Sequence, residues 1–161
     1  MRAARKSIEA VVLNPRLEKF GGLPLRATSG SAAIDLVSCE ESEVVIQPQG
    51  TYLFRFGFAI HIHDPSIAAW MLPRSGLGGR DGLVLANTVG LIDSDYTGEI
   101  MAMALNRQPA YGGRPVTVRP GDRIFQMAFL PVVLADLVKV GAFSETSERG
   151  SGAFGSTGTR R

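Results

Sequence analysis

Apolar side chains recur at every second position along one segment of the chain. The five concerned run from Phe54 through Phe56, Phe58 and Ile60 to Ile62, and a period of two places all of them on one face of a β-strand. Shorter apolar runs between turn residues predict further strands over residues 10–13, 33–38, 44–47, 67–72, 83–86, 99–106, 115–118 and 123–131. Helix is scarce, and the best candidate is a turn near residues 63–68. The pattern therefore predicts an all-β sandwich or barrel.

The composition agrees with an architecture rich in turns. The 161 residues include 19 Gly and 9 Pro, which excludes a bundle of long helices, while the hydrophobic fraction of 45% is ordinary for a packed globular domain. After residue 143 the only apolar side chains are Ala153 and Phe154, among Gly, Ser, Thr and charged residues. Such a segment buries too little apolar surface to offset its ordering entropy. We predict one domain over residues 1–143 and a mobile arm over residues 144–161.

The charge, the apolar runs and the cysteine content indicate which classes of partner and which cellular compartment to expect. The net charge of +2 is too small to indicate nucleic acid binding. The longest uninterrupted apolar run, residues 127–135, is too short to span a bilayer, so no membrane partner is expected. Cys39 is the single cysteine, which excludes an intrachain disulfide and a Cys-rich zinc site. We expect it to be a small buried thiol in a cytoplasmic protein.

The arm contains residues suited to binding a nucleotide. Its glycines at 150, 152 and 155 formally match G-x-G-x-x-G, but that dinucleotide fingerprint needs a preceding strand and a following helix, and the Rossmann interpretation fails. A different use is open for residues 149–158. Free backbone amides and hydroxyls can surround phosphate oxygens, Arg149 can clamp them, and Phe154 can stack on a base. The alternative is an ordinary disordered tail.

A second candidate is the glycine-rich turn at residues 72–79. Arg74 and Ser75 follow an apolar strand there and offer a charge and a hydroxyl for a phosphate-binding turn. The motif of a P-loop is absent. An ordinary glycine-rich turn is the alternative.

A third candidate is an acidic segment that follows a predicted β-hairpin of residues 83–86 and 89–92. The carboxylates are Asp93, Asp95 and Glu99. A carboxylate ionised at pH 7 can take a proton from water as that water attacks phosphorus. The alternative is a set of solvated acids in a turn.

His61 and His63 lie two positions apart on a predicted strand and share one face. Two imidazoles are half of a metal site. Because the chain has no further histidine, we do not expect a metal there.

Five segments, taken in order, resemble the five motifs of the trimeric deoxyuridine triphosphate nucleotidohydrolases, or dUTPases. They are residues 33–36 (Ala-Ile-Asp-Leu), 73–77 (Pro-Arg-Ser-Gly-Leu), 90–98 (Gly-Leu-Ile-Asp-Ser-Asp-Tyr-Thr-Gly), 121–126 (Gly-Asp-Arg-Ile-Phe-Gln) and 149–158 (Arg-Gly-Ser-Gly-Ala-Phe-Gly-Ser-Thr-Gly). The match covers nearly the whole chain. It implies a jelly-roll-like, distorted β-barrel that forms a homotrimer, in which neighbouring subunits share each active site and an arm is donated across.

The resemblance also implies a reaction. The family hydrolyses dUTP to dUMP and pyrophosphate by attack of water on the α-phosphorus, with Mg²⁺ on the triphosphate. This keeps uracil out of DNA and supplies dUMP for dTMP synthesis.

Residue roles follow from position in the matching motifs. Asp93 is similar to the general base, and Tyr96 to the residue whose ring packs against the deoxyribose and leaves no room for a 2′-hydroxyl. Uracil is expected to be recognised by Asn87, Leu91, Ile92 and Met101.

The remaining matching positions are expected to hold the triphosphate and its metal. Phosphate contacts are expected from Arg74, Ser75, Gly76 and Gln126. In the arm, Arg149 resembles the clamp on the γ-phosphate, Phe154 resembles the aromatic that stacks on uracil, and Gly155, Ser156 and Thr157 resemble the donors that close over the phosphates. Asp35 is expected to contact Mg²⁺ through water, since this ion keeps several of its waters.

Two other functions stay open at this point. A dCTP deaminase shares the fold, but that family places a glutamate general base in its central motif, whereas Glu99 comes early in the corresponding strand here. A non-catalytic jelly-roll module would leave Asp93, Arg149 and Phe154 without a reason to occur together.

Overall fold

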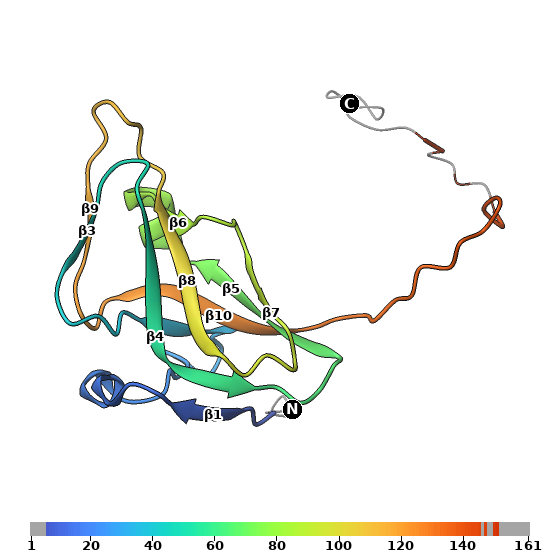
Figure 1. Cartoon of the computed structure of the whole chain (residues 1–161), viewed down its shortest axis with the longest axis horizontal. Coiled ribbons are helices and arrows are strands. Elements are labelled where there is room, and N and C mark those ends of the chain that lie inside the picture. The colour runs from blue at the N-terminus through green and yellow to red at the C-terminus, as the bar shows by residue number, and fades with distance from the viewer. Residues whose placement is uncertain (1–5, 146, 148–149, 152–161) are drawn as a thin grey trace.

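The computed structural model describes residues 6–145, 147 and 150–151 and consists mainly of antiparallel β-sheets (Figure 1). One four-stranded sheet has the order β1 (Glu9–Val12), β4 (Thr51–His61), β8 (Glu99–Asn106) and β6 (Leu83–Leu85). The other has the order β2 (Ala33–Val37), β10 (Arg123–Pro131), β5 (Ile67–Pro73) and β7 (Gly90–Ile92). A third sheet pairs β3 (Val44–Ile46) with β9 (Val116–Val118). The predicted all-β, jelly-roll-like fold is confirmed.

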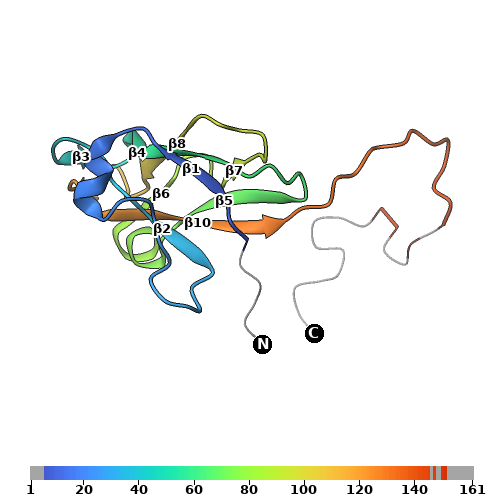
Figure 2. The same ribbon diagram turned by 90° about the horizontal axis from the view of Figure 1, so that it is seen from below.

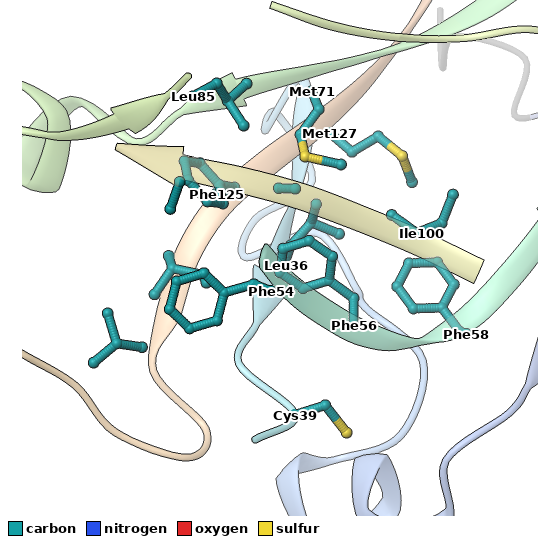
Figure 3. Packing of buried hydrophobic residues seen from close by; sticks show 14 of the residues in the cluster. Leu36, Cys39, Phe54, Phe56, Phe58, Met71, Leu85, Ile100, Phe125 and Met127 are labelled. Carbon is teal, nitrogen blue, oxygen red and sulfur yellow. The ribbon is translucent and has the colours of Figure 1, made fainter. Parts of the chain in front are cut away.

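The core lies between the two larger sheets. All five alternating residues of the segment around β4 are buried, and Phe54 and Phe56 have no exposed surface. Figure 3 shows the phenylalanines of β4 beside Leu36, Phe125 and Met127 of the opposite sheet. The rings of Phe56 and Phe125 meet edge to face, with their centroids 6.4 Å apart. The period of two therefore identified the core face of this strand correctly.

A bulge in β4 is built on a glycine. The pairing of β4 with β8 shifts between Arg55 and Ala59, and Gly57 within the shift has a φ of 73°. A Cβ atom at Gly57 would lie 2.9 Å from Sγ of Cys39, so glycine is required for its backbone and for the space. The Gly57 carbonyl accepts hydrogen bonds from the backbone N–H groups of Leu13 and Asn14, which attaches the end of β1. Cys39 is buried as predicted, and burial raises the pKa of its thiol.

The helical turns differ from the expectation. A 3₁₀ helix, η1, spans Pro15–Phe20, where the Asn14 side chain accepts from the Arg16 N–H and Pro15 supplies the fixed φ of a first turn. A single π-helical turn, η2, spans Leu77–Asp81. Residues 63–68 contain a non-helical turn and the start of β5, so the prediction of a helix there was wrong.

The predicted hairpin of residues 83–86 and 89–92 was also wrong. β6 pairs with β8 in one sheet, whereas β7 pairs with β5 in the other. The connection turns sharply, with Thr88 at a φ of 67° and its N–H donating to the Leu85 carbonyl. Both strands face the same core from opposite sheets, so apolar patterning alone could not distinguish this arrangement from a hairpin.

The segment after β10 leaves the barrel. Residues 133–145 have no regular strand or helix, and Figure 2 shows this segment running away from the sheets. Large apolar side chains are exposed along it, among them Val133 at 92%, Leu137 at 101% and Phe143 at 91%. The predicted boundary between residues 143 and 144 stays a prediction, since most of the arm lies outside the described residues. No helix in the described part of the chain is long and apolar enough to cross a membrane.

Candidate active site

A cavity of about 240 Å³ lies where β7 and its following loop meet β8 and β5. Six of the residues predicted to bind or transform a substrate line it: Asn87, Leu91, Ile92, Asp93, Tyr96 and Met101. They come from the connection before β7, from β7 itself, from the loop after it and from β8. An adjoining cavity of about 380 Å³ shares Asn87 and Met101 with the first. The fold therefore gathers the residues assigned to the base, the sugar and the attacking water at one place.

The inner wall of the cavity depends on close approach between strands. Gly90 is directly opposite Met71 in the pairing of β7 with β5, and a Cβ atom on Gly90 would lie 3.0 Å from Cβ of Met71. Met71 is buried and lines both cavities. Met71, Gly90 and Ile100 were not predicted as site residues. Gly90 lies in the third motif, which could have drawn attention to it, whereas Met71 and Ile100 look like ordinary core in the sequence and only the register of the strands reveals them.

Tyr96 is positioned by its neighbour Gly98. A Cβ atom on Gly98 would lie 2.6 Å from Cζ of the tyrosine, so the ring occupies space that only glycine leaves open. The Tyr96 hydroxyl donates to the backbone carbonyl of Glu99 at 3.0 Å. Tyr96 is 40% exposed as a residue, which leaves part of its surface available to a ligand.

Asp93 is exposed at the end of β7, in a loop with two backbone restraints. The N–H of Tyr96 donates to the Asp93 carbonyl at 3.2 Å, and the N–H of His63 donates to the Ser94 carbonyl at 3.2 Å. The Asp93 carboxylate thus stands on a tethered backbone at the wall of the cavity, open to water.

Glu99 also lines the cavity, but its carboxylate is occupied. Arg55 pairs with Oε2 at 2.8 Å and the Gly57 N–H donates to Oε1 at 3.1 Å. Among the three acids of this segment, Asp93 is therefore the one that is both on the cavity wall and free of an ion pair within the described residues.

A second group, in which Asp35 and Arg74 were predicted and Arg123 was not, forms a cationic cluster where the middle of β2 meets the end of β5 and the start of β10. Arg74 Nε lies 2.9 Å from Oδ1 of Asp35, and Arg123 Nη1 lies 3.2 Å from Oδ2. Arg74 also donates to the Arg123 carbonyl at 2.9 Å. The three side chains share one negative and two positive charges, so a net charge of +1 is left for an anion. Ser75 and Gly76 are exposed directly after Arg74.

Strand register builds this cluster. Gln126 on β10 is directly opposite Asp35 on β2, and its Nε2 donates to the Pro73 carbonyl at 2.9 Å. Arg123 was not predicted, although it lies inside the fourth motif. Residues three apart on a regular strand face opposite sides, but the pairing of β10 with β2 shifts between Arg123 and Phe125. The sequence contains no signal for that irregularity.

Within the described residues, the two groups remain separate, with no hydrogen bond or ion pair joining the cavity to the Asp35 cluster. The predicted arm residues Arg149, Phe154, Gly155, Ser156 and Thr157 lie outside the described part of the chain.

The fold and the two groups define a jelly-roll protein equipped for an anionic ligand, and comparison with known proteins gives the family. A family model described as dUTPase matches residues 21–158. Deoxyuridine 5′-triphosphate nucleotidohydrolases from Salmonella typhimurium and Salmonella arizonae are each 50% identical over 155 residues, covering 96% of this chain and 99% of theirs. The chain belongs to the dUTPase family.

Solved structures agree on the fold. A dUTPase of Staphylococcus bacteriophage 80alpha, with dUpNHpp, is 23% identical and superposes with a TM-score of 0.83 over 96% of this chain and 99% of its own. A dUTPase from phage phi11 of S. aureus is 20% identical, with a TM-score of 0.75 over 86% and 99% of the two chains.

The net charge of the Asp35 cluster predicts how it responds to an anion. Asp35→Asn raises the charge of the trio to +2, and Arg123→Gln lowers it to zero. Hydrogen bonds to charged groups contribute about 1.5–3 kcal/mol. In the absence of Mg²⁺, Asp35→Asn should therefore lower the dissociation constant of inorganic pyrophosphate at least tenfold, and Arg123→Gln should raise it at least tenfold, which is a change of about 1.4 kcal/mol in each case. Calorimetric titration measures this. Arg119→Gln, which alters an arginine paired with Glu43, is the control; equal affinity in all variants would contradict phosphate binding by the cluster.

Proposed function

We propose that this protein hydrolyses dUTP to dUMP and pyrophosphate with Mg²⁺, as its family membership implies. The observation that carries the proposal is the cavity between β7 and β8, with Asp93 on its wall and the residues assigned to uracil around it. In the cell this reaction keeps uracil out of DNA and supplies dUMP for dTMP synthesis. The cytoplasm is the proposed location, since the single cysteine is a free, buried thiol.

The cavity suits a single pyrimidine ring. At about 240 Å³ it is smaller than the roughly 300–1,000 Å³ of typical ligand pockets, so the sugar and the phosphates extend outside it. Leu91, Ile92 and Met101 supply apolar surface, and the backbone of β7 supplies donors and acceptors that distinguish uracil from cytosine. In this proposal Tyr96, which lies over Gly98, packs against the deoxyribose and excludes a 2′-hydroxyl. Packing alone gives about 10²-fold discrimination.

Asp93 acts as the general base. Its exposed carboxylate takes a proton from the water that attacks the α-phosphorus, and the bond to the bridging oxygen breaks to release pyrophosphate. A general base contributes about 10²- to 10⁴-fold. Preorganised positive charge supplies the larger share of the rate enhancement. In this chain the charge comes from the cationic cluster of Arg74 and Arg123, and from Arg149 of the arm.

The residues of the chain fit a magnesium ion that is held mainly by the triphosphate. Asp35 supplies the hard oxygen ligands that Mg²⁺ and its waters prefer. Both of its oxygens already accept from an arginine, but each carboxylate oxygen has a second lone pair, so Asp35 can still accept from a metal-bound water. The bound ion would neutralise charge on the phosphates. Gln126, fixed to the Pro73 carbonyl, and Arg74 orient the phosphates beside it.

A homotrimer with shared active sites accounts for three features of the chain. Apolar side chains between residues 133 and 143 are exposed, and none of the other described residues of the chain covers them. A groove of about 990 Å³, lined by residues such as Ala10, Ile34 and Phe129, lies beside the edge strand β1. In the part of the chain that the structure describes, no hydrogen bond or ion pair joins the cavity to the cationic cluster. We propose that residues 133–143 of one copy cover the groove beside β1 of another copy. This packing brings the cavity of one copy together with the cationic cluster of another. The number of copies, three, comes from the family.

The two other functions have less support. A dCTP deaminase would need a free glutamate at the centre of the site, whereas Glu99 is held by Arg55 and the Gly57 N–H. A non-catalytic module would not require the tethered loop that presents Asp93 at the cavity.

The proposed reaction is tested by offering dUTP, dCTP, dTTP and UTP separately, with and without Mg²⁺, while pyrophosphate and ammonia are measured. We expect pyrophosphate from dUTP alone, and loss of turnover when EDTA removes the metal. Release of ammonia from dCTP would contradict the proposal and support the deaminase.

Substitution of the general base gives a second test. Asp93→Asn keeps the shape and the cavity wall but cannot accept the proton, so kcat should fall about 10²- to 10⁴-fold while the affinity for a non-hydrolysable dUTP analogue changes little. Asp95→Asn, which alters an acid that does not line the cavity, is the matched control and should retain turnover. An unchanged kcat in Asp93→Asn would remove Asp93 from the mechanism.

Truncations separate assembly from closure of the arm. A chain ending at Phe143 should remain a trimer and lose most of its turnover, because the covering segment is kept and the arm is removed. A chain ending at Pro131 should lose the trimer as well. Light scattering and the pyrophosphate assay measure the two properties; a monomeric chain ending at Phe143 would show that the arm itself holds the assembly together.

A further inference from the structure

Three side chains with metal-binding atoms meet where β1 runs beside the end of β4. Glu9 is directly opposite His61 in the strand pairing, and His63 follows two residues later. Their ligand atoms all lie within 4.8 Å of one another. Nε2 of His63 is 2.7 Å from Oε2 of Glu9, and the two imidazole rings have centroids 3.5 Å apart at an interplanar angle of 34°.

The backbone at His63 creates this arrangement. His63 has a φ of 62°, a left-handed conformation that few residues other than glycine adopt. Its N–H donates to the carbonyl of Ser94 at 3.2 Å, so the loop that carries Asp93 holds the turn in place. The side chains of His63 and Glu9 are 55% and 75% exposed, which leaves them accessible from solvent.

We propose that Glu9, His61 and His63 bind a divalent cation of the zinc class, with water completing its coordination. Two imidazoles and one carboxylate form a donor set known for zinc. Imidazole favours zinc, copper and nickel, whereas Mg²⁺ prefers oxygen ligands, so this site is chemically distinct from the one proposed for the triphosphate. Tetrahedral ligands at about 2.1 Å from a zinc ion lie about 3.4 Å apart, and small rotations of these side chains reach that spacing.

Occupation of the site would affect two parts of the fold. The ion joins the first residue of the edge strand β1 to the end of β4, beside an ion pair between Lys6 and Asp64. It also fixes the turn at His63, which is hydrogen-bonded to the loop next to Asp93. Binding therefore stabilises the N-terminal strand and restrains the loop without entering the reaction.

The test is calorimetric titration of the full-length chain, free of any affinity tag, with Zn²⁺ alone. We expect one Zn²⁺ per chain and a rise in Tm on binding. Loss of an outer-shell partner alone costs about 10- to 100-fold in metal affinity, so His63→Asn and Glu9→Gln, which remove direct ligands, should each weaken binding at least tenfold. Asparagine is chosen at position 63 because it tolerates the left-handed conformation. Glu41→Gln, a carboxylate paired with Arg16 elsewhere, should leave the affinity unchanged.

Cobalt provides a readout that a general loss of stability would not produce. The chain contains two histidines and one cysteine, so the visible absorption of four-coordinate Co²⁺ should appear in the parent and disappear in the His61→Asn, His63→Asn double variant. Absence of stoichiometric Zn²⁺ binding, or binding that survives the double variant, would overturn the proposal. Hydrolysis of dUTP with Mg²⁺ is measured in parallel, so that failure of the zinc proposal and failure of the proposed hydrolysis are distinguished from each other.

Discussion

The phenylalanines of β4 are buried between the two four-stranded sheets, and the positions of the other parts of the molecule depend on this contact. Phe54 and Phe56 are fully buried, and Phe56 meets Phe125 of the opposite sheet edge to face. Burying one such side chain is worth about 1.5–3 kcal/mol. Because a slip of one residue would turn every side chain of a strand to the other face, this burial fixes the register of the sheets. The polar and charged side chains of the candidate site therefore lie at strand ends and in loops, as Arg74 and Asp93 do.

Interruptions of the regular sheets give those ends their shape. The bulge at Gly57 brings a backbone N–H to Glu99, which occupies that acid and leaves Asp93 as the free carboxylate on the cavity wall. The irregularity between Arg123 and Phe125 brings a second arginine to Asp35. Gly98 leaves the space in which Tyr96 lies. The two irregular pairings exchange regular hydrogen bonding for the placement of one side chain, which is the usual role of bulges beside functional sites, and Gly98 does the same from the bend before β8.

Much of the fold and part of the site could be predicted from the sequence. Alternation identified β4 and its core face, and the ordered motifs identified the residues that the structure gathers around the cavity and around Asp35. The pairing of β6 and β7 with different sheets could not be predicted, since both strands present the same apolar face. Arg123 and Met71 were missed because a bulge and a strand register place them. Glu9 and the two histidines meet only through the pairing of β1 with β4, a contact between distant positions that no local pattern contains.

The exposed apolar segment after β10, residues 133–143, links the stability of the proposed trimer to the protein concentration. Side chains such as Val133, Leu137 and Phe143 are exposed and contribute nothing to the core that the structure describes. In the proposed trimer, the stabilisation they provide comes from association. When a folded state gains free energy by binding its own copies, its stability rises with protein concentration by mass action. In the proposed trimer, a freshly made chain in a dilute solution would therefore pass through a less stable state with exposed apolar surface. The concentration of copies would then contribute to the stability of the fold.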